Sequence, residues 1–241
     1  MVLIPLSDDA PTERREPPYV TYALIALNVA VYLFELSYTD AAEASVDLRW
    51  GATPDLVFGG GADFLRRFAP LVTYMFLHGG FAHVFGNMLF LWIFGDDVED
   101  ALGHVRYALF YLVCGIAGAL VYCAFSEVRS APLIGASGAI AGVMGAYLML
   151  RPCAHVHVLV FVRVVPIRAM WVILVWTALQ VWRVFSPDAS NTAWWAHVGG
   201  LVTGAILMAA FRRPHVTLFE CVEERKFVSP WTRPPVSRIP R

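Results

Sequence analysis

The residues of this chain best suited to chemistry are a serine and a histidine, each inside an apolar segment. Ser137 lies in the run Gly-Ala-Ser-Gly at 135–138, and His197 lies in the run Ala-His-Val-Gly-Gly at 196–200. A serine hydroxyl becomes a nucleophile when a base takes its proton, and an imidazole is suited to that task near neutral pH. The two residue types therefore indicate nucleophilic catalysis in apolar surroundings.

The composition places these segments in a membrane. Hydrophobic residues make up 58% of the 241 residues and charged residues only 15%, which is far from the balance of a soluble protein. The formal net charge of -1 provides no basic surface for a nucleic acid. We therefore expect membrane lipids as partners and no nucleic acid.

Six apolar segments are expected to cross the membrane as helices. They lie at 20–37, 81–94, 105–125, 135–150, 169–185 and 192–211. Residues 38–69 mix charged residues with glycines and aromatic residues, which indicates an interfacial loop with short amphipathic pieces. The predicted fold class is an all-α membrane protein, a bundle of six transmembrane helices with an interfacial first loop.

Residues 156–165 form an apolar segment that is too short to span a membrane. The segment is interrupted by Arg163 and followed by Pro166. We expect it at the membrane interface before the fifth span, and membership of the fifth span is the alternative that the sequence leaves open.

The distribution of basic residues predicts the orientation. With six spans, thirteen of the 18 Lys and Arg residues lie on the side of the two termini, although seven of these belong to the tail. The positive-inside rule then places both termini in the cytoplasm. We expect a polar cytoplasmic N-terminal segment at 1–19, a membrane domain at 20–211 and a flexible cytoplasmic tail at 212–241, in a protein of the inner cell membrane.

The four cysteines show no metal-binding or redox spacing. They are Cys114, Cys123, Cys153 and Cys221, and none forms a C-x-x-C pair. We expect all four to be packing residues.

Small residues share one face of the fourth span and one face of the sixth. On the fourth span they are Gly138, Ala141, Gly142 and Gly145, and on the sixth span Gly200 and Gly204 accompany His197. Such faces let two backbones approach closely, which would bring Ser137 and His197 within hydrogen-bonding reach. Packing alone is the commoner reason for a serine in such a stripe, whereas a histidine inside a span is costly and is a functional candidate.

Two further polar residues are expected at the depth of Ser137 and His197. His83 and Asn87 lie four residues apart on one face of the second span, near its outer end. Their side chains and the backbone N–H groups at the start of the fourth span would stabilise an oxyanion, and Gly135 would allow close backbone approach there. Since no carboxylate is placed to orient His197, a Ser-His dyad is expected.

Three motifs resemble those of the rhomboid family of intramembrane serine proteases. They are Phe-Leu-His-Gly-Gly-Phe-Ala-His-Val-Phe-Gly-Asn at 76–87, Gly-Ala-Ser-Gly at 135–138 and Ala-His-Val-Gly-Gly at 196–200. They occur in the family's order and spans, and the resemblance covers about residues 19–211. It implies a protease that cleaves transmembrane proteins near the outer membrane face and that needs no cofactor or metal.

The resemblance also implies roles for single residues. Ser137 would be the nucleophile and His197 the base, while His83 and Asn87, with the backbone amide of Ser137, would form the oxyanion hole. Substrates would be single-pass transmembrane proteins whose helix approaches laterally and unwinds to present a carbonyl to Ser137, with a small residue before the cut.

Three residues would have supporting roles. Gly135 and His78 would support the site, since His78 looks like the family's other second-span histidine. Glu99 looks like the acidic residue that follows the second span and is expected to be structural.

Two other functions remain as alternatives. One is a catalytically silent rhomboid-like protein that binds transmembrane helices, against which the presence of both Ser137 and His197 argues. The other is a metal-binding or transport protein that uses His78, His83 and His197, although no carboxylate lies at their depth.

Overall fold

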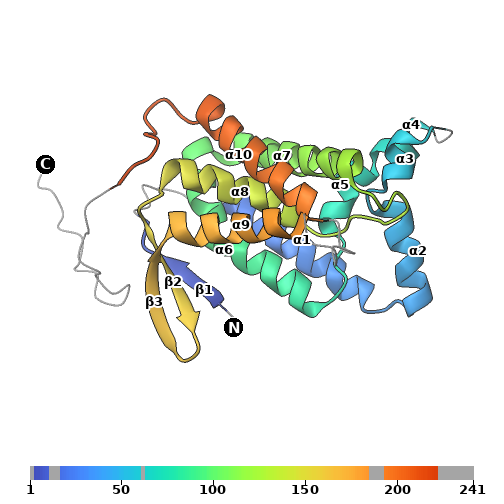
Figure 1. Ribbon diagram of the computed structural model, residues 1–241, viewed down its shortest axis with the longest axis horizontal. Coiled ribbons are helices and arrows are strands. Elements are labelled where there is room, and N and C mark those ends of the chain that lie inside the picture. Colours follow the sequence, from blue (N-terminus) through green and yellow to red (C-terminus); the bar gives the residue numbers. More distant parts are fainter. Residues whose placement is uncertain (1–2, 11–16, 61–62, 185–192, 222–241) are drawn as a thin grey trace, which may run out of the picture.

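The computed structural model describes residues 3–10, 17–60, 63–184 and 193–221 (Figure 1). Its long helices run side by side, with short helices at one end of the bundle and a small sheet at the other. In chain order the elements are β1 (Leu3–Asp8), α1 (Tyr19–Glu35), α2 (Asp40–Trp50), α3 (Pro54–Phe58), α4 (Phe64–Phe68), α5 (Pro70–Thr73), the 3-10 turn η1 (Tyr74–Phe76), α6 (Phe81–Leu102), α7 (His104–Phe125), α8 (Ser137–Leu150), β2 (His155–Val160), β3 (Arg163–Arg168), α9 (Ala169–Val184) and α10 (Trp194–Phe211).

Each of the six expected spans coincides with one long helix. These helices are α1, α6, α7, α8, α9 and α10, and most of their ends lie within two residues of the expected positions. The largest difference is in α6, which continues past Phe94 to Leu102. Gly103 ends it with a φ of 83°, a conformation that glycine adopts without strain.

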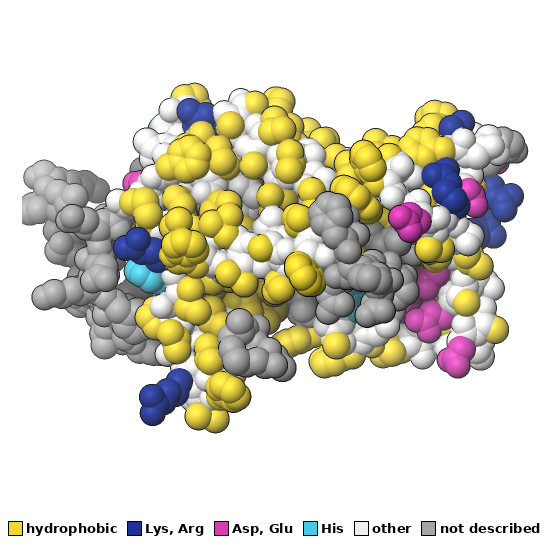
Figure 2. All heavy atoms as spheres, viewed as in Figure 1, with side chains coloured by type: hydrophobic (Ala, Val, Ile, Leu, Met, Phe, Trp, Pro, Cys, Tyr) yellow, Lys and Arg dark blue, Asp and Glu magenta, His cyan; other side chains and the backbone are white. Residues whose placement is uncertain are grey.

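The helices differ in how well they qualify as membrane spans. In the described part of the chain α7 and α10 are long and apolar enough to cross a membrane, and α6 joins them if it and Phe64–Phe76, bent by 82°, are one broken span. Helices α1, α8 and α9 are apolar but shorter. Figure 2 shows hydrophobic side chains along the bundle and charged side chains toward its ends. This face of the bundle is therefore mostly apolar, as expected in a membrane, but the count of six spans is not confirmed.

Helix α8 is the central element of the bundle. It packs against α6, α7 and α10, and every residue from 138 to 147 is buried. A helix that is apolar on all sides is typical of a protein core or of a membrane span. On one side the Cβ position of Gly145 is occupied by the backbone of Leu201 on α10. The expected close approach of two small-residue faces is thus confirmed.

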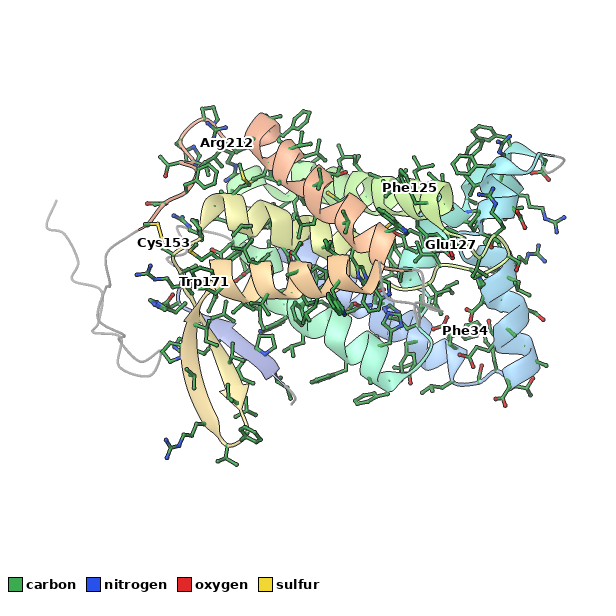
Figure 3. All side chains as sticks on the ribbon, in the orientation of Figure 1. Phe34, Phe125, Glu127, Cys153, Trp171 and Arg212 are labelled. Atoms are coloured by element: carbon green, nitrogen blue, oxygen red, sulfur yellow. A yellow bond between two sulfur atoms is a disulfide. The ribbon has the colours of Figure 1, made fainter. Side chains whose placement is uncertain are left out.

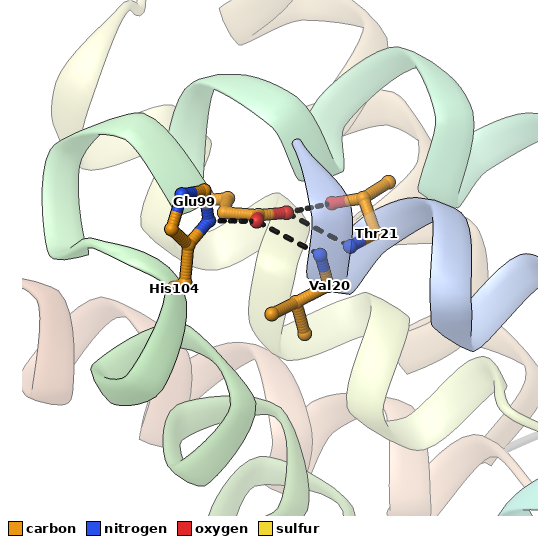
Figure 4. Close-up of polar contacts among 4 residues, drawn as sticks. All are labelled: Val20, Thr21, Glu99 and His104. Carbon is orange, nitrogen blue, oxygen red and sulfur yellow. Dashed lines mark hydrogen bonds and ion pairs between the residues drawn. The ribbon is translucent and has the colours of Figure 1, made fainter. Parts of the chain in front are cut away.

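Glu99, in the last turns of α6, links that helix to the start of α1 by hydrogen bonds. Its carboxylate accepts hydrogen bonds from the backbone N–H groups of Val20 and Thr21 at 2.9 and 2.8 Å, and from the Thr21 hydroxyl at 2.7 Å (Figure 4). Nδ1 of His104 lies 2.5 Å from the same carboxylate. Because the first N–H groups of a helix lack carbonyl partners within it, an anion there is stabilising. Glu99 is therefore structural, as expected.

A three-stranded antiparallel sheet corrects the all-α prediction. Strand β2 lies between β1 and β3, and the β1–β2 register shifts between Pro5 and Ser7. Residues 156–165 belong to the β2–β3 hairpin and are not part of α9. Their sequence alternates His and Val at 155–158, a period-2 pattern of β-branched residues that favours a strand. Part of the N-terminal segment expected to be polar is thus an ordered strand.

A disulfide corrects the expectation that all four cysteines are packing residues. Cys153, which follows α8, is bonded to Cys221, which lies beyond α10 (Figure 3). The signal was absent from the sequence because the two residues are 68 positions apart and follow no short motif. Cys114 and Cys123 are free and buried in α7, as expected of packing residues.

Candidate active site

Ser137 is the first residue of α8 and follows a constrained glycine. Gly135 has a φ of 107°, and its backbone N–H donates to the carbonyl oxygen of Tyr74 at 2.9 Å. A Cβ on Gly135 would lie 2.5 Å from Nε2 of His83. Both the backbone conformation and the nearby imidazole therefore require glycine at this position.

The side chains of Ser137 and His197 are in hydrogen-bonding contact. Oγ of Ser137 lies 2.7 Å from Nε2 of His197, which extends from the first turns of α10. The histidine is 9% exposed, and the rings of Trp176 and Trp194 lie 5.4 and 5.8 Å from it, centroid to centroid. A half-buried serine in contact with a buried imidazole suits proton transfer from the hydroxyl.

Gln180 on α9 is a neighbour of His197 that the sequence analysis missed. Its Oε1 lies 2.7 Å from Nδ1 of His197, and its Nε2 donates to the carbonyl oxygen of Trp176 at 3.2 Å. With Oε1 as the acceptor, Nδ1 carries the proton and the Nε2 lone pair of His197 faces Ser137. The available signal was an amide within an otherwise apolar segment, a placement that calls for a buried partner.

His83 and Asn87 reach the same place from α6. Asn87 is 8% exposed, and its Nδ2 would lie 3.5 Å from a Cβ on Gly135. Both residues line one cavity together with Ser137 and His197. The structure thus brings together the four polar residues that the sequence placed at one depth.

His78 contacts Asn87 but does not itself line the cavity. Its Nε2 is 2.9 Å from Nδ2 of Asn87, and its ring makes an edge contact with that of His83 at 5.1 Å. The backbone N–H of His78 donates to the carboxylate of Glu35 at 3.3 Å. His78 can therefore orient the Asn87 amide, and Glu35, at the end of α1, is a second residue that the sequence analysis missed.

The cavity beside Ser137 has a volume of about 620 Å³. The polar side chains in its lining include Ser137, His197, His83, Asn87 and Gln180. The apolar side chains in its lining include Phe90, Met144 and Trp176. A cleft of this size and mixed lining accommodates a short peptide segment. Ile140 and Met144 lie on the face of α8 that continues from Ser137 into the cavity.

The described residues offer no metal site. No group of three or more His, Cys, Asp or Glu side chains within this part of the chain is arranged to hold a metal ion. His78 contacts Asn87, and His197 contacts Ser137 and Gln180, so these two ring systems are engaged in hydrogen bonds. The geometry gives the metal-binding alternative no support.

Comparisons with known proteins agree on one family. A family model described as "Rhomboid domain" matches residues 65–214. The chain is 31% identical to "Rhomboid protease GluP" of Bacillus subtilis over 202 residues, which is 84% of this chain and 36% of that protein. It is 29% identical to "Rhomboid protein 1, mitochondrial" of Saccharomyces cerevisiae over 203 residues, 80% of this chain and 53% of that protein.

A plant relative shows a similar level of identity over a shorter stretch. "RHOMBOID-like protein 5" of Arabidopsis thaliana is 31% identical over 137 residues, 57% of this chain and 42% of that protein. The chain spans about a third to a half of the length of these curated relatives. The matched range of the family model includes Ser137, His197 and their cavity.

Proposed function

The chain belongs to the rhomboid family, a family of integral membrane proteins, and we propose that it is an intramembrane serine endopeptidase. The observation that carries the proposal is the 2.7 Å contact between Oγ of Ser137 and Nε2 of His197. In this proposal Ser137 is the nucleophile and His197 the general base of a catalytic dyad.

The reaction proceeds in two stages. Nε2 of His197 takes the hydroxyl proton of Ser137 as Oγ attacks the substrate carbonyl carbon, and the carbonyl oxygen becomes an oxyanion. His197 then protonates the leaving amine, the peptide bond breaks, and an acyl-serine ester remains. Water, deprotonated by His197, attacks the ester, and the Ser137 hydroxyl is restored when the acid product leaves.

The oxyanion is stabilised by donors beside Gly135. The Asn87 amide has two N–H groups, of which one faces His78 and one remains for the oxyanion. The imidazole of His83, against Gly135, and the backbone N–H of Ser137 at the start of α8 are the other donors. Gly135 and His78 support the site, because one admits His83 and the other orients Asn87.

The substrates in this proposal are single-pass transmembrane proteins. A peptide bond within a helix is shielded by its own hydrogen bonds, so the substrate segment must unwind before its carbonyl reaches Ser137. The apolar wall of the cavity accommodates apolar side chains of the unwound segment, with a small residue before the cut. Membrane lipids surround the exposed apolar faces of helices such as α9 and α10.

The placement in the membrane extends the proposal. Helices α1, α6, α7, α8, α9 and α10 are the six spans, and α2 to α5 form the interfacial first loop. In this proposal the termini are cytoplasmic, as the distribution of basic residues favours, and the cavity is near the outer face of the inner cell membrane. The membrane domain is 20–211, the N-terminal segment is 1–19 and the tail is 212–241, of which 222–241 lie outside the described residues.

A reporter assay tests the proposed function. The full-length protein in proteoliposomes is incubated with a single-pass reporter protein, and the cleavage products are identified by mass spectrometry. The wild-type protein is expected to cleave the reporter, and Ser137→Ala and His197→Ala are expected to be inactive. Ser130→Ala, which removes an exposed hydroxyl in the loop before α8, is the matched control and is expected to retain activity. Unchanged cleavage by Ser137→Ala would falsify the mechanism.

The silent helix-binding alternative predicts a different outcome. A protein that only binds transmembrane helices has no activated serine, so a fluorophosphonate probe would not react with it. Stoichiometric labelling of Ser137, lost in His197→Ala, supports the protease, because acylation requires both the hydroxyl and its base.

A further inference from the structure

Gln180 lies at the end of the buried face of α9. Ala169 and Ile173 on this face are fully buried and Gln180 is 6% exposed, whereas Leu179 and Trp182 beside it are 56% and 72% exposed. An amide is costly to bury unless its donor and acceptor groups are paired. Its position on the inward face of a mostly apolar helix therefore depends on the partners that it finds there.

Both ends of the Gln180 amide have a partner. One N–H of Nε2 donates to the carbonyl oxygen of Trp176 at 3.2 Å, one turn earlier in the same helix. Oε1 consequently faces α10, where it accepts from Nδ1 of His197 at 2.7 Å. A neutral imidazole carries a proton on one ring nitrogen and a lone pair on the other. Because Nδ1 donates its hydrogen bond to Gln180, the lone pair is at Nε2.

We propose that Gln180 is a positioning residue, which holds the imidazole of His197 in the tautomer and orientation that a base for Ser137 requires. In serine proteases with a triad, a buried carboxylate has this role. A neutral amide keeps the geometry without placing a second charge in an apolar site, where an ionised carboxylate is costly. The inference rests on the proposed function and turns the expected dyad into a Ser-His-Gln arrangement.

Three variants of the full-length protein separate positioning from packing. Gln180→Leu keeps the approximate volume and removes the acceptor, and Gln180→Glu keeps an acceptor and adds a charge that favours a protonated His197. Thr177→Val is the matched control, because the Thr177 hydroxyl on the same helix donates to the carbonyl oxygen of Ile173, at 2.8 Å, and not to His197. For each protein kcat, KM, the pH–rate profile, the fluorophosphonate reaction rate and the melting temperature are measured.

The expected result is a loss in kcat without a loss in binding or folding. Gln180→Leu lowers kcat and the fluorophosphonate rate by roughly ten- to a thousandfold, less than the about 10⁴-fold effect of disabling a triad carboxylate. Its KM and melting temperature stay close to those of Thr177→Val. Gln180→Glu recovers activity relative to Gln180→Leu and moves the acidic limb of the pH–rate profile to higher pH.

Two results would overturn the proposal. One is a kcat for Gln180→Leu within twofold of the Thr177→Val value. The other is a loss in kcat for Gln180→Leu that comes with a lower melting temperature, together with a Gln180→Glu variant that neither recovers activity nor shifts the acidic limb of the pH–rate profile. A role in packing alone would give this second result.

A spectroscopic measurement separates this inference from the proposed function. In protein labelled with ¹⁵N-histidine, the signals of His197 are identified by their absence in His197→Ala. The inference expects the proton on Nδ1 in the wild-type protein and a mixture of tautomers in Gln180→Leu. If the wild-type protein showed this pattern but cleaved no reporter, the proposed protease function would be contradicted and the positioning role of Gln180 retained. If the wild-type protein and Gln180→Leu had the same His197 tautomer, the positioning role alone would be contradicted.

Discussion

Gly200 on α10 lies against the carbonyl oxygen of Gly138 on α8, with no room for a methyl group between them. Gly138 directly follows Ser137, and Gly200 follows His197 by three residues, about one turn. This close approach of the two backbones is thus beside the proposed catalytic pair, and Gly204 makes an equally close one with Gly142 further along the same helices. The glycine contacts between α8 and α10 therefore help to set the distance at which Oγ of Ser137 meets Nε2 of His197.

The variant Gly200→Ala is expected to destabilise the protein and lower its activity. The added methyl group pushes α10 away from α8, and overpacking of this kind costs about 1–3 kcal/mol. Thermal unfolding and reporter cleavage are measured together. Gly86→Ala on α6 is the control for stability, since, among the described residues, no atom beyond its own stretch of helix lies within 4 Å of its added Cβ. A melting temperature and cleavage rate equal to those of the wild type would show that α8 and α10 tolerate a larger separation.

Asn87 and His78 are expected to act as one unit. Asn87→Ala removes an oxyanion donor and is expected to lower kcat by about 10²–10³-fold, with a smaller change in KM. His78→Leu leaves the Asn87 amide without the partner at 2.9 Å and is expected to cost about tenfold by the same route. The double variant should be no slower than Asn87→Ala. A multiplicative loss in the double variant would mean that His78 acts independently of Asn87.

Glu99→Gln is expected to lower stability and to leave the chemistry unchanged. A glutamine at this position has one acceptor oxygen for the N–H groups of Val20 and Thr21, and leaving a buried donor unpaired costs about 1–3 kcal/mol. The melting temperature should fall, while kcat per folded molecule stays constant. Glu127→Gln, at an exposed residue after α7, is the control and should not change either value (Figure 3). A fall in kcat at constant stability would assign Glu99 to the active site.

The sequence was sufficient to predict features that depend on helical periodicity or on the free-energy cost of placing a polar side chain inside a membrane span. The small-residue faces predicted the approach of α8 to α10, and the cost of an imidazole inside a span singled out His197. These signals are local to one helix, so they survive without knowledge of the fold. Gln180 carries a weaker signal of the same kind, because an amide costs less than an ionisable group to place inside a span.

The sequence was insufficient where distant segments meet. The strand β1 exists because Leu3–Asp8 pairs with β2, about 150 residues away, and nothing within the first segment specifies that partner. The bond between Cys153 and Cys221 also depends on how α10 brings the following segment back to the end of α8. Both features lie at one end of the bundle, outside the apolar segments that the periodicity describes.

Reduction of the disulfide between Cys153 and Cys221 is expected to lower stability. A cross-link over 68 residues restricts the unfolded chain, and a contribution of about 2–4 kcal/mol is typical. Dithiothreitol should lower the melting temperature of the wild-type protein and leave that of Cys153→Ser unchanged. Cys114→Ser is the control, because Cys114 is free and its variant should keep the response to dithiothreitol. Equal responses of the wild type and Cys153→Ser would show that the bond does not stabilise the fold.

The docking of β1 is expected to weaken as the pH rises toward 6. Burial raises the pKa of Asp8 to about 6, with a further contribution from the nearby carboxyl group of Asp96, and the Tyr147 hydroxyl donates a hydrogen bond to the Asp8 carboxylate. The carboxyl group therefore binds its proton more tightly in the folded protein than in the unfolded chain, where its pKa is about 4. The resulting stability is complete below about pH 4 and is lost as the pH rises through about 6.

Hydrogen exchange of the β1 amides between pH 4 and 7.5, corrected for the intrinsic rate, measures this effect. The free energy of opening should fall with pH in the wild type, and Asp8→Asn, whose side chain stays neutral, should show a flatter profile over the same range. Glu127→Gln removes an exposed carboxylate at the end of the bundle opposite to β1 and should follow the wild type (Figures 1 and 3). If Asp8→Asn and the wild type gave parallel profiles, the ionisation of another group would govern the docking of this strand.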